Sequence, residues 1–442
     1  MPKNRLKQIV KLQKEGKPVG ICSVCTGNGY VIEAALEYAR DNNSVVLIES
    51  TANQVDQNGG YTGMKPKDFH DYVYDMADRV GLNRDRVFLG GDHLGPLTVT
   101  HLPEKEAMEY ACTLLHDYVA AGFTKIHIDT SMKVADDDPD ERLSDEVIAR
   151  RGAQLAKVCQ EAYDQLLEQD PSAIPPVYIV GSEVPIPGGA QEEDAGMQVT
   201  SPKDFRATVQ AFQEAFEKEG LLETTWKDVM AVVVQPGVEE KDAGCEEYDR
   251  GRAKELMESI KDYDQFVFEG HSTDYQTKHK LREMVEDGIG ILKVGPGMTA
   301  AMREGLFSLA YMEQAQFHGR QEQQSHLFEV LEEEMLKEPK YWEKYYHGNE
   351  NDKWFKRKFS FSDRCRYYWP NPRVHQAQEI MIENFRKEGI NLAILKQLMP
   401  IQYTKVREGH LECDPEALIK DVIKCAIDEY EFATHQDKLV SE

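Results

Sequence analysis

The segment VFLGGDHLGP, residues 87–96, carries the pattern that decides the fold of this chain. A short apolar run ends in two glycines, and the polar pair Asp92-His93 follows just before Gly95 and Pro96. Continuous apolar runs of this kind are typical of strands that are covered on both faces. Because glycine and proline permit a turn, the segment predicts a buried strand that delivers both Asp92 and His93 to one edge of a sheet.

Similar apolar runs recur on both sides of this segment, at residues 19–22, 45–49, 125–129, 177–181, 230–235, 265–269 and 290–294. The stretches between them show helical spacing, as at Phe69, Val73, Met76 and Val80. Strands that alternate with helices in this way favour a (β/α)8 TIM barrel of the α/β class. The alternative is a doubly wound open sheet. Such sheets usually carry G-x-G-x-x-G after the first strand, and this chain has no such motif there.

The pattern changes near residue 320. Residues 321–337 are polar and helical, residues 341–346 and 355–369 are aromatic and basic, and residues 376–387 and 415–434 again predict helices. We therefore expect two parts. Residues 1–320 form the barrel that carries the active site, and residues 321–442 form a helical C-terminal extension packed on it.

Composition excludes several classes of partner. The chain has 442 residues, with 52 basic and 78 acidic side chains, so its net charge is -26. Such a surface repels nucleic-acid backbones and anionic lipids, and we expect neither nucleic acid nor a membrane as partner. No apolar run approaches the ~20 residues of a membrane span, and the basic N-terminal stretch lacks the apolar region of a secretory signal. Eight scattered cysteines, with a single C-x-x-C at Cys22 and Cys25, predict reduced thiols in a cytoplasmic protein.

Polar residues stand where the expected strands end, which is where TIM barrels place their catalytic groups. His93 and His271 come from different strands and could share a divalent ion, with Glu183 and Gln235 as oxygen ligands. Asp92 and Glu183 are then the candidates for the general acid/base. The alternative is that both histidines are hydrogen-bonded structural residues in glycine-rich turns.

Two further features complete the candidate site. His127 and Asp129 alternate onto one face of their strand; position favours Asp129 as the catalytic group and His127 as a supporting or core residue. Glycine-rich loops at 270–273 and 295–299 suit a phosphate, although they also fit ordinary strand-to-helix turns. The expected substrate and phosphate contacts are Glu49, Asn53, Gln54, Ser272, Thr273, Asp274, Lys293, Gly295 and Arg303.

Together these motifs resemble a known family. VLIESTANQVDQNGGYTGM, FLGGDHLGP, KIHIDTSM, GSEVPIPGG, FEGHSTDYQ, LKVGPGMTAAMRE and FSDRCRYYWP are similar to the Z-type subunit family of class II D-tagatose-1,6-bisphosphate aldolases, over nearly the whole chain. The resemblance implies a class II aldolase-like barrel of bacterial sugar catabolism, galactitol included. It also implies a divalent metal ion (zinc, manganese, nickel or magnesium) and a homo-oligomer.

The resemblance implies particular roles as well. Asp92 is the acid/base and His93 a metal ligand, Glu183 with Gly188-Gly189 is the acidic segment, and His271-Ser272 combines a metal ligand with a phosphate contact. The catalytic aldolases have a third metal-binding histidine at the end of strand 6, where this chain has Gln235. An amide oxygen binds zinc less strongly than an imidazole does.

Two functions are compatible with that departure. One is an enzyme, a carbon-4 epimerase that interconverts tagatose 6-phosphate and fructose 6-phosphate by retro-aldol and aldol steps. The other is an accessory subunit that stabilises and activates a catalytic aldolase subunit. Three carboxylates in one barrel mouth, Asp92, Asp129 and Glu183, are stable only beside a cation or protons, and this favours the enzyme. A sugar-phosphate kinase is disfavoured because the chain has no GxxxxGK[ST] loop.

The motif FSDRCRYYWP raises one further question. Its residues Asp363, Arg364 and Arg366 are candidates to reach the site, where the arginines would meet a substrate phosphate. The alternative is a salt-bridged packing segment.

Overall fold

A closed parallel barrel forms the centre of the molecule. The computed structural model describes residues 3–183 and 198–440, so Gly188 and Gly189 lie outside the described residues. The eight barrel strands are β1 (Ile21–Cys25), β2 (Val46–Thr51), β3 (Val87–Leu94), β4 (Lys125–Ile128), β5 (Val177–Val180), β6 (Val229–Val234), β9 (Val267–Gly270) and β10 (Ile289–Val294), and β10 pairs with β1 to close the ring. The predicted (β/α)8 barrel is confirmed.

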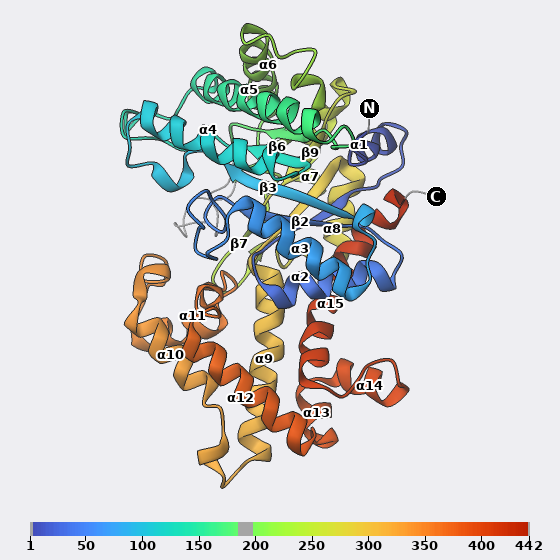
Figure 1. Ribbon diagram of the computed structural model, residues 1–442, viewed down its shortest axis with the longest axis vertical. Helices are drawn as coiled ribbons and strands as arrows, with labels where there is room; N and C mark the ends of the chain where they lie inside the picture. The colour runs from blue at the N-terminus through green and yellow to red at the C-terminus, as the bar shows by residue number, and fades with distance from the viewer. Residues whose placement is uncertain (1–2, 184–197, 441–442) are drawn as a thin grey trace.

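Helices cover the outside of the barrel (Figure 1). They are α2 (Gly29–Asp41), α3 (Pro66–Val80), α4 (Glu104–Ala120), α5 (Asp145–Gln169), α6 (Pro202–Lys218), α7 (Arg250–Ser259) and α8 (Lys278–Asp287). Ile9 in the short helix α1 (Lys7–Lys14) and Leu6 at its N-cap pack against apolar residues of the barrel interior, such as Leu47 and Ile179. After β6 a small antiparallel ladder pairs β7 (Glu239–Glu240) with β8 (Cys245–Glu246). In the part of the chain that is described, no helix is both long and apolar enough to span a bilayer.

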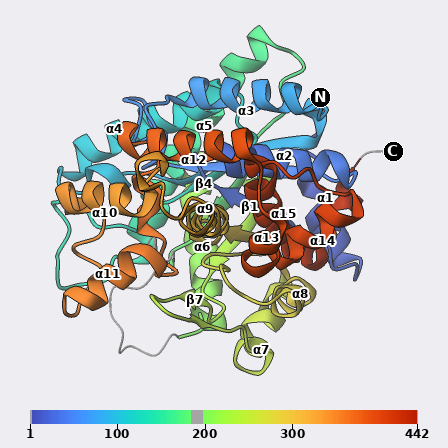
Figure 2. The same cartoon turned by 90° about the horizontal axis from the view of Figure 1, so that it is seen from below.

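The predicted helical extension is also confirmed. It comprises α10 (Leu327–Lys337), α11 (Glu350–Phe359), α12 (Pro372–Glu388), α13 (Leu392–Leu398), α14 (Pro400–Glu408) and α15 (Pro415–Thr434). Helix α9 (Pro296–Gln316) starts at the barrel and runs out among these helices, and α15 returns alongside it (Figure 1). Seen from below, α9 is viewed end-on with the extension helices around it (Figure 2). Since α9 serves both parts, the domain boundary at residue 320 stays a prediction.

The end of the chain is fastened to the first strands of the barrel. The buried Gln436 accepts a hydrogen bond from the backbone N–H of Cys22 at 2.8 Å and donates one to the carbonyl of Val45 at 2.7 Å. The backbone N–H of Gly20 donates to the carbonyl of Thr434 at 2.8 Å. The extension therefore contributes to the stability of the barrel as well as lying on it.

Replacement of Gln436 by alanine should lower the free energy of unfolding by about 1–3 kcal/mol, because a buried N–H and a buried carbonyl lose their partners. Urea unfolding followed by circular dichroism measures this change. The exposed neighbour Lys438 provides the control, since Lys438→Ala should change stability by less than about 0.5 kcal/mol. Equal stability of the two variants would contradict the fastening role.

Candidate active site

A chain of buried charges crosses the barrel interior. The side chain of Lys125 is 0% exposed, and its Nζ lies 2.5 Å from Oε1 of Glu49 and 2.8 Å from Oε2 of Glu269. Glu49 also pairs with Lys293, whose Nζ lies 2.9 Å from Oδ2 of Asp92. Burial raises the pKa of these carboxyl groups, but Lys125 and Lys293 outweigh it at Glu49 and Glu269 and hold the pKa of both below the ordinary value. At Asp92 the charge of His93, followed by that of Lys293, lowers the pKa well below the ordinary value.

A backbone irregularity in β3 brings Asp92 and His93 to the site together. His93 has a φ of 49°, and the register between β3 and β4 shifts between Gly91 and Leu94. A bulge of this kind re-aims side chains that would otherwise alternate between two faces. Gly95 lies so close to the next strand that a Cβ there would be 1.7 Å from the carbonyl oxygen of Asp129. The turn expected from the glycines is thus present.

Three imidazoles meet above the buried charges. The ring centroids of His93 and His127 are 5.2 Å apart, those of His93 and His271 are 5.0 Å apart, and those of His127 and His271 are 5.2 Å apart. The three rings come from β3, from β4 and from the loop after β9, and all are buried. Residues far apart in the sequence therefore form one nearly equilateral group.

Each imidazole is oriented by a carboxylate. Nδ1 of His93 lies 2.7 Å from Asp129, Nδ1 of His127 lies 2.7 Å from Asp92, and Nε2 of His271 lies 2.9 Å from Glu269. Histidines that bind metals usually donate their second N–H to a carboxylate, which sets the tautomer and the ring orientation. The arrangement is therefore typical of a metal site.

The donor set fits a divalent cation. Asp92, His127, Glu269 and His271 each place one ligand atom so that all four lie within 4.8 Å of one another. Nε2 of His127 is buried and has no hydrogen-bond partner among the described residues, and a buried unsatisfied group of this kind is costly. In the surrounding network four carboxylates face two ammonium groups, so two positive charges are lacking when the imidazoles are neutral. A divalent ion would both satisfy the nitrogen and balance the charge.

The imidazoles differ in their protonation. Burial lowers the pKa of His271 to about 4, so this ring is neutral and able to bind a metal at physiological pH. Burial also acts to lower the pKa of His93, but the carboxylates of Asp92 and Asp129 outweigh it and raise that pKa above the ordinary value. A divalent ion in the neighbouring cluster would act on His93 in the opposite direction.

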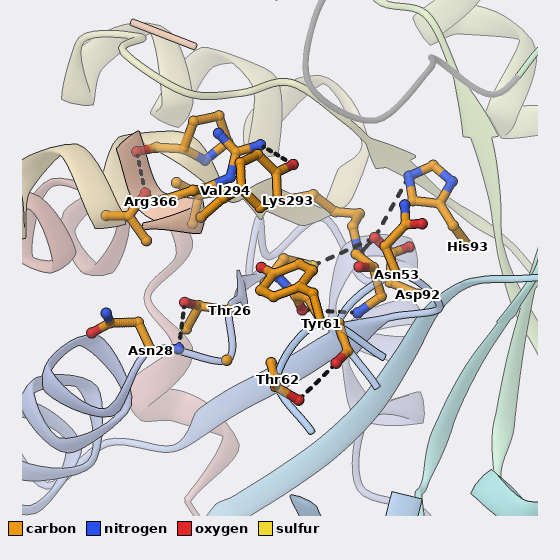
Figure 3. A pocket seen from close by; sticks show the side chains of 18 of the residues that line it. Thr26, Asn28, Asn53, Tyr61, Thr62, Asp92, His93, Lys293, Val294 and Arg366 are labelled. Atoms are coloured by element: carbon orange, nitrogen blue, oxygen red, sulfur yellow. Dashed lines mark hydrogen bonds and ion pairs between the residues drawn. The ribbon is translucent and has the colours of Figure 1, made fainter. Parts of the chain in front are cut away.

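A cavity of about 290 Å³ opens above this group. Its lining includes Asp92, His93, His271 and Lys293, which Figure 3 shows in part: the Lys293 chain reaches the carboxylate of Asp92, next to His93. Arg366 of the extension lies on the opposite side of the cavity from His93 (Figure 3). The cavity size suits a small polar ligand.

Several other predicted contacts also line the cavity, namely Asn53, Gln54, Ser272, Asp274 and Gly295. Glu49 lies beneath it in the charge network, and the hydroxyl of Thr273 donates to the carbonyl of Lys293 at 2.6 Å. Arg303 is turned away to pair with Asp363 at 2.8 Å, which fixes the extension to α9. Arg364 stacks on Tyr345, so Arg366 is the arginine of the FSDRCRYYWP motif that reaches the cavity.

The structure does not bring Glu183 or Gln235 to the imidazoles. Oε1 of Gln235 accepts hydrogen bonds from the backbone N–H groups of Gly237 at 2.7 Å and Val238 at 3.0 Å, so this amide closes its own loop. The carboxylate of Glu183 lies 3.3 Å from Arg142 and 2.5 Å from the hydroxyl of Thr200. Both side chains are therefore engaged by partners other than the imidazoles, beyond the ends of their strands.

Sequence reasoning missed Lys125 and Glu269 and assigned His127 only a supporting or core role. The signal for all three was present. Lys125, His127 and Asp129 alternate along one face of a strand, as do Glu269 and His271. A charged residue inside an apolar run must be paired when the strand is covered on both faces, and this is what the barrel interior provides.

The family model described as D-tagatose-1,6-bisphosphate aldolase subunit GatZ/KbaZ-like matches residues 6–435, which confirms the resemblance inferred from the motifs. A solved structure from Sinorhizobium meliloti 1021, described as a probable tagatose 6 phosphate kinase, is 39% identical with a TM-score of 0.84, and the match covers 94% of this chain and 100% of that chain.

More distant matches are to aldolases. A putative fructose-1,6-biphosphate aldolase from Coccidioides immitis is 14% identical with a TM-score of 0.42, and the match covers 72% of this chain and 85% of that chain. A fructose-bisphosphate aldolase from Campylobacter jejuni is 14% identical with a TM-score of 0.42, and the match covers 89% of this chain and 93% of that chain.

Replacement of His127 by alanine should weaken zinc or manganese binding by at least about 10-fold, because it removes the buried nitrogen that lacks a partner. Isothermal titration calorimetry of the metal-depleted chain measures the affinity directly. Substitution of the exposed His410 is the control and should leave it unchanged. Unaltered binding by His127→Ala, or strong loss in Gln235→Ala, would contradict the assigned ligands.

The buried carboxyl of Glu240 should make stability depend on pH. Burial, and then the charge of Asp274, raise the pKa of Glu240 to about 8. The folded state therefore keeps a proton that the unfolded chain has already lost, and stability falls as pH rises from about 4.5 to 8, by on the order of a few kcal/mol. Urea unfolding at about pH 5.5 and 8.5 should show a smaller difference in Glu240→Gln than in the native chain; an equal difference would contradict this assignment.

Proposed function

This chain belongs to the D-tagatose-1,6-bisphosphate aldolase subunit family of the GatZ/KbaZ-like type, and we propose that it is a metal-dependent carbon-4 epimerase. Its reaction interconverts tagatose 6-phosphate and fructose 6-phosphate by retro-aldol and aldol steps. The observation that carries the proposal is the triangle of buried imidazoles, each held by a carboxylate, of which His93 and His271 line the cavity. A subunit whose only task is to stabilise a partner has no need of that costly group.

The metal would be held by His127, Glu269 and His271, with the carboxylate of Asp92 beside it. When bound, a divalent ion supplies Lewis-acid polarisation of the substrate ketone. The fixed ammonium group of Lys293, which lines the cavity beside Asp92, adds positive charge where the negative charge of an enediolate develops.

Asp92 and His93 form the acid/base pair of this proposal, which replaces the metal-ligand role predicted for His93 from the sequence, because the possible metal-binding group includes His127 and not His93. Nε2 of His93 lies 3.6 Å from Oδ2 of Asp92, and both residues line the cavity, while Asp129 holds the far side of the ring. The proton of the carbon-4 hydroxyl passes to this pair as the bond between carbons 3 and 4 breaks. The electrons of that bond enter the enediolate, and carbon 4 becomes an aldehyde.

The second half of the reaction reverses these steps on the other face. The aldehyde rotates in the cavity, the enediolate re-forms the carbon 3–carbon 4 bond, and the pair returns its proton to the carbon-4 oxygen. All atoms of the substrate are retained, so the reaction needs no co-reactant. Glu183 has no part in these steps, because its carboxylate is bound to Arg142 and Thr200.

The alternative is an accessory subunit of a catalytic aldolase, and the description of the family as an aldolase subunit favours it. This alternative predicts a stable complex with the catalytic subunit and no turnover by the chain alone. A kinase, the activity named for the relative from Sinorhizobium meliloti, has less support, since the chain contains no GxxxxGK[ST] loop.

The purified chain, given fructose 6-phosphate and Mg²⁺, Mn²⁺, Ni²⁺ or Zn²⁺ in turn, should produce tagatose 6-phosphate, which ¹³C NMR detects. Asp92→Asn should lower the rate by about 10²–10⁴-fold, because the acid/base pair is lost. The exposed His375 serves as control, and His375→Ala should retain full activity.

The absence of product with every metal would contradict the epimerase. If the chain then forms a stable complex with a catalytic aldolase subunit and raises its rate, the accessory function is the correct one.

A further inference from the structure

The loop expected to bind a phosphate is filled by a carboxylate of the protein itself. Oδ1 of Asp274 accepts hydrogen bonds from the backbone N–H of Gly295 at 3.0 Å and of Gly297 at 2.7 Å, at the start of α9. Backbone N–H groups at a helix N-terminus are a ready site for an anion. Here that site is already occupied, so these two donors are not directed at a ligand.

Three other donors expected at this end of the cavity are engaged as well. The hydroxyl of Thr273 donates to a backbone carbonyl, Lys293 pairs with Glu49 and Asp92, and Arg303 pairs with Asp363. A phosphate that entered here would have to displace these partners.

A second carboxyl group faces the same part of the cavity. Glu240, in β7, is 3% exposed and lines the cavity together with Asp274, and its Oε2 has no hydrogen-bond partner among the described residues. Burial raises the pKa of Glu240 to about 8 and that of Asp274 to about 6. At neutral pH Glu240 therefore carries a proton and can donate as well as accept a hydrogen bond.

The positive charge close to these two carboxyl groups is the guanidinium of Arg366, which already has partners. Arg366 acts to lower the pKa of both carboxyl groups, and its guanidinium donates to the backbone carbonyls of Ser362 and Asp363. Among the residues that the structure describes at this end of the cavity, one guanidinium beside two carboxyl groups leaves no surplus positive charge for a phosphate dianion. Sugar hydroxyls, in contrast, both donate and accept, and they match a neutral carboxyl beside a carboxylate.

We propose that Glu240 and Asp274 form a hydroxyl-recognising subsite that binds the unphosphorylated carbon-1 end of a ketohexose 6-phosphate and rejects a second phosphate there. This inference rests on the proposed function for the identity of the sugar. It deepens that function by distinguishing a monophosphate from a bisphosphate. A carboxylate facing the ligand disfavours the bisphosphate by charge repulsion and by the unpaired groups left behind.

The test is a binding measurement that does not depend on turnover. Fructose 6-phosphate and fructose 1,6-bisphosphate differ only at carbon 1, so isothermal titration of the metal-loaded full chain with each sugar isolates the subsite. The native chain should bind the monophosphate at least about 10-fold more tightly. Asp274→Asn keeps an oxygen for the N–H groups of Gly295 and Gly297 but removes the charge. It should therefore lower the ratio of the affinity for the monophosphate to that for the bisphosphate several-fold.

A substitution at Glu240 tests the subsite independently, in case Asp274→Asn fails to fold. Glu240→Leu should weaken fructose 6-phosphate binding by about 3–10-fold through loss of a hydrogen bond, whereas Glu247→Leu, an exposed glutamate on the neighbouring segment, is the matched control. Circular dichroism establishes that each variant is folded.

The outcomes separate this inference from the proposed function. If the chain prefers the monophosphate but shows no epimerase turnover, the proposed subsite is supported and the proposed epimerase function is contradicted. Equal or tighter binding of the bisphosphate, no binding of either sugar, or an unchanged ratio in folded Asp274→Asn would each overturn the subsite.

Discussion

The ammonium group of Lys125, fully buried at the centre of the barrel, is the feature on which the rest of the site depends. A charge in such a place is tolerated only when it is paired, and Lys125 is paired with Glu49 on one side and Glu269 on the other. Glu269 in turn holds His271, and Glu49 holds Lys293, which binds Asp92. The positions of the groups at the cavity floor therefore follow from charge pairing in the layer beneath them. Removing any member would leave an uncompensated charge in the barrel.

The extension completes the site from the opposite side. The pairing of Arg303 with Asp363, together with the hydrogen bond from Thr299 to Asp363 at 2.5 Å, holds the FSDRCRYYWP segment against α9. This contact brings Arg366 to the cavity. The barrel mouth is thus lined by both parts of the chain, so a ligand there is bounded by residues from β3 on one side and from the extension on the other (Figure 3).

The fold was accessible from the sequence because eight apolar runs, each followed by a polar loop and a helix, leave few architectures open. It could also be predicted that His93, His271 and Asp92 lie close together, because the carboxyl ends of parallel strands meet at one edge of the barrel. The directions of the side chains beyond the strand ends could not be predicted from the sequence. Glu183 and Gln235 turn to local partners, and Asp274 fills the glycine loop, because those directions depend on tertiary contacts rather than on periodicity.

The most direct test of this account is the position of a metal in a crystal of the chain. Anomalous diffraction from crystals grown with Zn²⁺ or Mn²⁺ should give one strong peak at bonding distance, about 2.0–2.2 Å, from Nε2 of His127, with His271 and the carboxylate of Glu269 as further ligands. A peak at Glu183 or Gln235, or no peak within the barrel at saturating metal, would contradict the account.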